Sequence, residues 1–327
     1  MTIYRKVILA ALILAFGVIT LGAYVRLSDA GLGCPDWPGC YGKLTPQNAS
    51  EAIDAALAVR PDGPVSHAKA WKEMVHRYFA GTLGLLILVI AVLAWRGRRD
   101  MRGGVALPLL LLGLVVFQAL LGMWTVTRLL KPLIVSSHLL GGMATLALLA
   151  WLWFRERGRS GHVYYADTGH LRDPALLGLA LVIAQIALGG WVSTNYAGLA
   201  CPDFPVCHGA WMPPMDFEQG FTLHRRLGET ATGALLPLTA LTAIHWTHRV
   251  MALLVTLYLG WLVVRLLRSP GYAGMGLAIG VLLALQVSLG IGNVLFSLPL
   301  PVAVAHTAGA ALLLVSLVRL NYRVRRR

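Results

Sequence analysis

Glu73 and His76 stand three residues apart at the start of a long apolar run, in the segment Glu73-Met-Val-His76-Arg77. This spacing places the carboxylate and the imidazole on one face of a helix. Ionisable side chains are costly inside a membrane span and usually mark a functional site there. The pair is therefore a candidate functional site, with the carboxylate as a candidate general base or cation stabiliser.

Four histidines share this kind of setting, namely His76, His138, His248 and His306. Each lies about six residues from one end of its apolar run, or roughly 9 Å at 1.5 Å per residue. One such histidine alone is typical of a hydrogen bond to a neighbouring helix. Two imidazoles facing each other in a four-helix bundle are what axial ligation of a heme iron needs. Small residues that leave room for a flat macrocycle are Gly81, Gly84, Gly141, Gly142, Ala308 and Gly309.

The elements that must position these residues are membrane helices. Of the 327 residues, 57% are hydrophobic and 13% are charged. The apolar runs match the ~20 residues that cross a ~30 Å hydrocarbon layer. We expect eight spans, over residues 7–25, 73–95, 105–126, 133–154, 174–193, 243–264, 273–296 and 301–318. The fold class is an all-α polytopic membrane protein.

The net charge of +14 has an uneven distribution along the chain. Lys and Arg gather at both termini and in the loops at 96–102 and 155–172, whereas most acids lie in the long loops at 27–70 and 194–242. The positive-inside rule then places both termini in the cytoplasm and the long loops outside. We attribute the excess charge to this rule and to contact with anionic lipid, and we expect no nucleic-acid partner.

The two halves of the chain repeat each other. The segment Gly31-Leu-Gly-Cys-Pro-Asp-Trp-Pro-Gly-Cys-Tyr-Gly42 recurs as Gly198-Leu-Ala-Cys-Pro-Asp-Phe-Pro-Val-Cys-His-Gly209. Outside it, Leu21-Gly22 matches Leu188-Gly189, Gln118 matches Gln286, and the four histidines match two by two. An even number of helices per repeat gives both halves the same orientation. We expect two tandem pseudo-symmetric four-helix bundles, over 1–158 and 174–327, joined by a cytoplasmic linker at 159–173.

The repeats differ at the position of Glu73. The second copy has His245-Trp-Thr-His248 in place of Glu73-Met-Val-His76, so only the first half has an acid there. A di-iron site needs the Glu-x-x-His unit twice plus two more glutamates, which this chain does not offer in its spans. Glu73 also fits a simple ion pair with Lys69, Lys72 or Arg77. We expect one half to carry out chemistry and the other to move electrons.

The four cysteines lie in the two long loops, as the pairs Cys34–Cys40 and Cys201–Cys207. On the oxidising side of a membrane each pair fits a disulfide. A zinc site would need four ligands, and His208 is the one histidine near either pair. The spacing leaves open whether these bonds are structural or exchange thiols with a partner.

Other polar residues carry weaker signals. Arg77 and Arg249 each follow a histidine, and two roles fit both: contact with heme propionates, because a guanidinium matches a carboxylate, or snorkelling to lipid phosphate. Gln118 and Gln286 predict interhelical hydrogen bonds. Residues 47–59 predict a short surface helix.

This combination of motifs resembles the heme A synthase family of bacteria and mitochondria, which converts heme O to heme A for cytochrome oxidase. The resemblance covers essentially the whole chain. It implies that Glu73 is the catalytic carboxylate and that His76 and His138 hold the substrate or product heme. His248 and His306 would ligate a heme b. The implied reaction oxidises the C8 methyl of heme O to a formyl group, with water as the oxygen source and electrons leaving through heme b.

The resemblance also implies a setting, which is the bacterial cytoplasmic membrane with the cysteine loops on the periplasmic side. Besides heme O and lipid, the partners to consider are the heme O-forming enzyme, cytochrome oxidase assembly factors, a second copy of the chain and an electron acceptor of unspecified class. Two other functions fit the same ligands. They are a quinol-linked, di-heme b-type electron carrier and a heme-delivery or assembly factor without catalysis.

Overall fold

The computed structural model describes residues 2–98, 104–158 and 169–325. Over these residues it is helical and has no β-strand, and eight helices are long and apolar enough to cross a membrane. They are α1 (Ile3–Leu27), α3 (His67–Arg96), α4 (Ala106–Thr127), α5 (Pro132–Gly158), α6 (Gly169–Thr194), α8 (Leu238–Leu267), α9 (Ala273–Leu295) and α10 (Leu300–Arg325). The expected fold class is confirmed. Parts of the expected basic loop at 96–102 and linker at 159–173 lie outside the described residues.

Several helices begin before their apolar runs do. Helix α3 starts at His67, because Oγ of Ser66 accepts a hydrogen bond from the backbone N–H of Lys69 (3.2 Å) and caps the helix. Helix α8 starts directly after Pro237, and α6 starts at Gly169, within the expected linker. Hydropathy marks only the apolar part of a helix, whereas capping groups set its ends.

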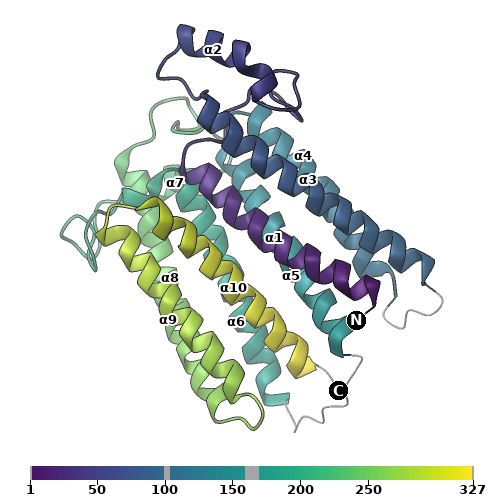
Figure 1. The fold of residues 1–327 in the computed structure, drawn as a ribbon. Coiled ribbons are helices and arrows are strands. Elements are labelled where there is room, and N and C mark those ends of the chain that lie inside the picture. The colour runs from purple at the N-terminus through teal and green to yellow at the C-terminus, as the bar shows by residue number, and fades with distance from the viewer. Residues whose placement is uncertain (1, 99–103, 159–168, 326–327) are drawn as a thin grey trace.

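The long loops contain shorter helices. In the first loop, η1 (Gln47–Ala49) leads into α2 (Ser50–Val59), which confirms the expected surface helix. The second loop contains η2 (Ala197–Leu199) and α7 (Phe217–Phe221). Both termini lie at the end of the molecule opposite α2 and α7 (Figure 1). All of the cysteines therefore lie at one end of the helices and both termini at the other.

The membrane helices form two rings of four. In the first ring α1 contacts α3 and α5, and α4 contacts α3 and α5; in the second, α6 contacts α8 and α10, and α9 contacts α8 and α10. Helices α3 and α5 are thus diagonally opposite across the first ring, as α8 and α10 are across the second. The rings meet where α5 and α10 pack together, flanked by α1 against α10 and α5 against α6 (Figure 1).

A pseudo-twofold axis relates the rings, and two contacts at their cysteine-loop end show it directly. Arg26 Nη2 donates to the carbonyl oxygen of Ser193 (2.6 Å), and the Tyr196 hydroxyl donates to Oδ1 of Asp29 (2.8 Å). The partners are 167 residues apart in both cases, which is the offset of the repeated loop motif. Equivalent positions of the two halves therefore touch each other at the axis.

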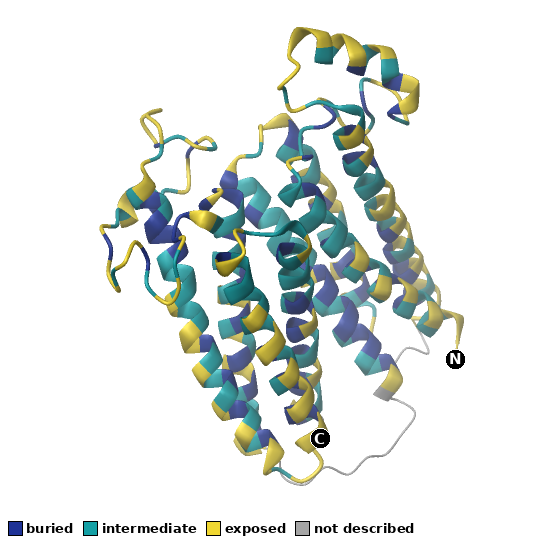
Figure 2. Ribbon diagram, turned by 60° about the vertical axis from the view of Figure 1, so that its left-hand side comes forward, coloured by how far each residue is buried: buried dark blue, intermediate teal, exposed yellow. Residues whose placement is uncertain are grey.

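The burial pattern matches a membrane environment. One continuous apolar core joins residues of both rings, including Ile8, Leu149, Leu171 and Leu317. Exposed apolar side chains such as Leu85, Val116, Leu257 and Val281 lie on α3, α4, α8 and α9. Exposed residues alternate with buried ones along the helices (Figure 2). An apolar outer surface over four helices is what contact with lipid requires.

Candidate functional site

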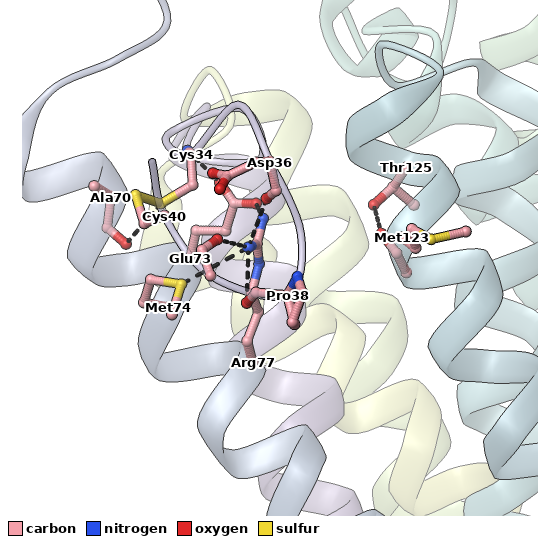
Figure 3. A network of polar contacts seen from close by, with 12 residues as sticks. Cys34, Asp36, Pro38, Cys40, Ala70, Glu73, Met74, Arg77, Met123 and Thr125 are labelled. Atoms are coloured by element: carbon pink, nitrogen blue, oxygen red, sulfur yellow. Dashed lines mark hydrogen bonds and ion pairs between the residues drawn. A yellow bond between two sulfur atoms is a disulfide. The ribbon is translucent and has the colours of Figure 1, made fainter. Parts of the chain in front are cut away.

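Glu73 lies in the outer part of α3 and is only 4% exposed. Its Oε1 accepts a hydrogen bond from Nη2 of Arg77 (2.5 Å), one turn further along the helix. Its Oε2 accepts from the backbone N–H of Cys34 (3.0 Å) in the first long loop. The carboxylate therefore joins the helix to the loop, with both oxygens occupied (Figure 3).

Arg77 completes this connection from the helix side. Its Nη1 donates to the carbonyl oxygens of Asp36 (2.8 Å), Pro38 (3.2 Å) and Gly39 (2.5 Å). These carbonyls belong to the loop that the Cys34–Cys40 disulfide closes (Figure 3). One arginine thus supplies the hydrogen bonds for a tight turn whose carbonyl groups converge on it.

The loop also holds its own shape. The carboxylate of Asp36 accepts hydrogen bonds from the backbone N–H groups of Tyr41 and Gly42, each at 2.6 Å. Gly42 has a φ of +69°, a left-handed conformation in which glycine is unstrained. The loop is therefore a preformed unit that α3 grips through Glu73 and Arg77.

The second half builds the same unit with one change. The Cys201–Cys207 disulfide closes the loop, and Arg249 donates to the carbonyl oxygens of Cys201 (2.7 Å), Asp203 (2.8 Å) and Val206 (2.9 Å). At the place of Glu73, His245 is 5% exposed, and its Nε2 accepts from Nε of Arg249 (3.2 Å). The duplicated scaffold therefore holds a carboxylate in one half and an imidazole in the other.

Asp203 corresponds to Asp36 and accepts from the backbone N–H groups of His208 and Gly209, each at 2.7 Å. The hydrogen bond from Gly209 is the main cause that holds the pKa of Asp203 below its ordinary value. The ring of His208 points elsewhere, with Nε2 3.4 Å from Oγ1 of Thr242.

Both expected disulfides are confirmed. Among the described residues, no group of three or more His, Cys, Asp and Glu side chains could hold a metal ion, so neither the zinc nor the di-iron alternative has a ligand set there. The ion pair of Glu73 with Arg77, one of those that the sequence allowed, is confirmed. The loop carbonyls that Arg77 and Arg249 contact were not suggested by the sequence, because such contacts depend on how a loop is folded. The contact of these two arginines with propionates remains a prediction.

The four histidines lie on diagonally opposite helices, two in each ring. His76 on α3 and His138 on α5 are close enough to interact electrostatically, as are His248 on α8 and His306 on α10. The buried Nδ1 atoms of His76, His138 and His306 have no hydrogen-bond partner among the described residues. A buried ring nitrogen without a partner is unusual in a purely structural histidine.

A glycine on the neighbouring helix faces each of the four rings. A Cβ at Gly22 would lie 2.9 Å from Cε1 of His76, and one at Gly122 would lie 3.4 Å from Cε1 of His138. The corresponding distance is 3.1 Å for Gly189 to His248 and for Gly290 to His306. These glycines let each imidazole pack against the backbone of another helix. In the sequence, Gly22 and Gly189 are visible only as members of the repeated Leu-Gly pair.

Glutamines accompany the histidines. Gln286 Nε2 lies 3.4 Å from Nε2 of His306, which confirms the expected interhelical hydrogen bond. The Gln118 amide packs against Gly141, and its Nε2 has no partner among the described residues. The sequence reasoning missed Gln185, whose Nε2 lies 3.1 Å from Nδ1 of His248.

Comparison with known proteins identifies the family of this site. Residues 5–318 match the COX15-CtaA family model, described as cytochrome oxidase assembly protein. A heme A synthase of Shewanella oneidensis is 44% identical over 307 residues, which cover 93% of this chain and 92% of that protein. The chain belongs to the heme A synthase family. A further member, from Caulobacter vibrioides, is 28% identical over 98% of this chain and 94% of its own length. Membership in this bacterial family and the eight apolar helices together show an integral membrane protein.

In a member of this family, the four histidines can be compared with the ligands that a heme iron needs. Each ring offers two imidazoles from diagonally opposite helices, which is the donor set for six-coordinate heme iron. A glycine faces each of the four imidazoles, and Nδ1 of His76, His138 and His306, like that of His245, has no partner among the described residues. The residues therefore fit one heme in each half.

Proposed function

We propose that this protein is a heme A synthase, which oxidises the C8 methyl group of heme O to a formyl group and so supplies heme A to cytochrome c oxidase. The observation that supports it is the difference between the two copies of one scaffold. Glu73 and His245 occupy equivalent positions, with equivalent arginine partners, yet only Glu73 is an acid. One half is thus equipped for chemistry that the other half lacks.

The N-terminal half holds the substrate in this proposal. His76 and His138 bind the iron of heme O and keep its methyl group near Glu73. Conversion of the methyl to a formyl group takes one oxygen atom from water and releases four electrons and four protons. The loss of electrons from a carbon next to the porphyrin leaves a cation there, and a fixed negative charge stabilises it.

The geometry favours cation stabilisation over general-base catalysis for Glu73. Both carboxylate oxygens already accept hydrogen bonds, from Arg77 and from Cys34. Taking up a proton would weaken both of these bonds, whereas stabilising a cation requires no rearrangement. Arg77 and the disulfide loop therefore act as positioning groups for the carboxylate.

The C-terminal half holds the cofactor. His248 and His306 would ligate a heme b, which supplies one-electron redox chemistry when bound. Gln185 places its amide 3.1 Å from Nδ1 of His248 and keeps that imidazole oriented. We also infer that the basic end of the molecule faces the cytoplasm and that the cysteine loops face the periplasm.

The proposal is tested by the pigment of purified variants, identified by extraction and mass measurement. Glu73→Gln keeps the shape of the side chain, and we expect the variant to retain heme O but to form little or no heme A. The matched control is His245→Gln, at the equivalent position of the other half, which should still form heme A. Normal heme A formation by Glu73→Gln would refute the role of Glu73. Heme b as the only pigment of the unaltered protein would instead indicate the di-heme electron carrier.

A further inference from the structure

A cationic cavity opens at the cysteine-loop end of the molecule, between the start of α5 and the loop before α8. Its volume is about 570 Å³. Its polar lining includes Lys131, His224, Arg225 and Arg226, opposed by a single carboxylate, that of Glu229. Leu133, Ile134 and Leu223 supply an apolar wall. A cavity of this composition suits an anionic group attached to an apolar body.

The cavity has a rigid cation at its base and free cations at its rim. Arg225 is 5% exposed and is held by hydrogen bonds to the carbonyl oxygens of Thr222 and Glu229 (3.2 Å each) and to Oδ1 of Asn195 (2.5 Å). Lys131 and Arg226 are exposed, and their side chains form no hydrogen bond or ion pair within the part of the chain that the structure describes. The rim cations are therefore available to a ligand.

The cavity lies near His138, at the start of the same helix, α5. Ile134 lies one helical turn before His138 on the same face of α5, and Lys131 lies two turns before it. At 1.5 Å per residue, Lys131 is roughly 10 Å further out than His138 along the helix. The cavity thus lies further out than the four-helix ring that we assign to the substrate heme, at the end of the molecule that carries the loops.

The C-terminal half has no counterpart of Lys131. The equivalent segment before His306, residues 295–305, contains no charged residue, and Pro299 occupies the place of Lys131. Arg77 and Arg249, the residues expected to meet propionates, each donate to three loop carbonyls. The segment that leads into His138 therefore carries a cation that the segment leading into His306 lacks.

We propose that this cavity binds the propionate carboxylates of the porphyrin that enters the N-terminal half. The inference rests on the proposed function in one respect, the assignment of the substrate heme to His76 and His138. Lys131 and Arg226 capture the carboxylates, and Arg225 fixes the base of the site. A phospholipid phosphate has similar chemistry, so the experiment must separate the two anions.

The test uses the purified full-length protein in neutral detergent, with zinc protoporphyrin IX as a fluorescent ligand and its dimethyl ester as the uncharged analogue. The Lys131→Gln/Arg226→Gln double variant should bind the free acid about tenfold more weakly for each cation removed, and the ester with unchanged affinity. Arg128→Gln is the matched control, because Arg128 is exposed three residues before Lys131 but does not line the cavity. Its affinity for the free acid should not change.

Three results would overturn the inference. They are unchanged affinity of the double variant for the free acid, an equal loss for the ester, and an equal loss in Arg128→Gln. Loss of bound anionic phospholipid from the double variant, with porphyrin affinity retained, would assign the cavity to lipid instead. Because zinc protoporphyrin IX needs no oxidation, this measurement remains decisive even if the protein forms no heme A. With heme O as substrate, the double variant should show a raised KM and a nearly unchanged kcat.

Discussion

Gly22 should control heme binding in the N-terminal half although it is not a ligand. In Gly22→Ala, the new Cβ would lie 2.9 Å from Cε1 of His76, whereas ordinary van der Waals contact begins at 3.4 Å. The ring must therefore retreat by about 0.5 Å, and overpacking of this kind costs about 1–3 kcal/mol. We expect the imidazole to move aside in the apoprotein, where no iron fixes it, whereas as an iron ligand it cannot. Heme retention should therefore fall by about 5-fold to 150-fold.

The sign of the effect on the apoprotein distinguishes this mechanism from simple misfolding. Alanine in place of glycine inside a helix contributes about 0.5–1 kcal/mol to stability. Gly22→Ala should therefore lose heme without any loss of thermal stability in the heme-free state. Gly17→Ala is the control on the same helix, because Gly17 is exposed and a Cβ there meets no atom within 4 Å.

The assay measures the ratio of heme to protein after purification. The spectrum of the low-spin ferric heme then reports the orientation of the axial ligands. Gly122→Ala should have a smaller effect than Gly22→Ala, because its Cβ would lie 3.4 Å from Cε1 of His138. Equal heme retention in Gly22→Ala and Gly17→Ala would refute the steric argument. A larger loss in Gly122→Ala than in Gly22→Ala would refute it as well.

Three further predictions concern the disulfide loops. Replacing Cys34 and Cys40 together by Ser should lower heme A formation at least tenfold while heme stays bound, because the loop supplies the N–H that holds Glu73. An unchanged amount of heme A in the extracted pigment would refute the role of the loop in positioning Glu73. The pKa of Asp203 is lowered mainly by the Gly209 N–H. The Asp203 carboxylate therefore stabilises the loop above its ordinary pKa of 3.8, and this stabilisation is lost as the pH falls through the lower pKa of the folded state. Amide exchange at His208 and Gly209 should accelerate in that acidic range, and Asp203→Asn should remove this pH step. The His245→Glu variant should fold, because Arg249 can pair with the new acid. The double variant Glu73→Ala/His245→Glu should form no heme A. Restored heme A formation in that double variant would show that the halves are interchangeable.

Much of the fold could be predicted because hydropathy and internal repetition act over long stretches of sequence. The eight spans, the surface helix at 47–59 and both disulfides follow from such patterns. The ends of α3 and α8 could not be predicted in this way, because a cap such as Ser66 depends on one side chain outside the apolar run. Helix ends depend on local hydrogen bonds that a window of hydropathy averages out.

The parts of the site that could not be predicted depend on contacts between distant segments. Arg77 and Arg249 donate to loop carbonyls, and carbonyl positions depend on backbone conformation, not on residue type. Gly22 and Gly189 are visible as a repeat, but only the structure shows that each one faces an imidazole on another helix. The cavity at Lys131 joins residues about one hundred positions apart, so no local motif announces it.

The contacts at the pseudo-twofold axis bear on how such a chain could have arisen. In a symmetric dimer of a single four-helix ancestor, each residue on the axis would meet its own copy. If both halves carried the residues of the first, arginine would oppose arginine at position 26 and aspartate would oppose aspartate at position 29. Fusion into one chain allows the two copies to diverge, so Arg26 meets Ser193 and Asp29 meets Tyr196. Joining the halves thus allows unlike residues to pair at the axis, and allows each half to specialise.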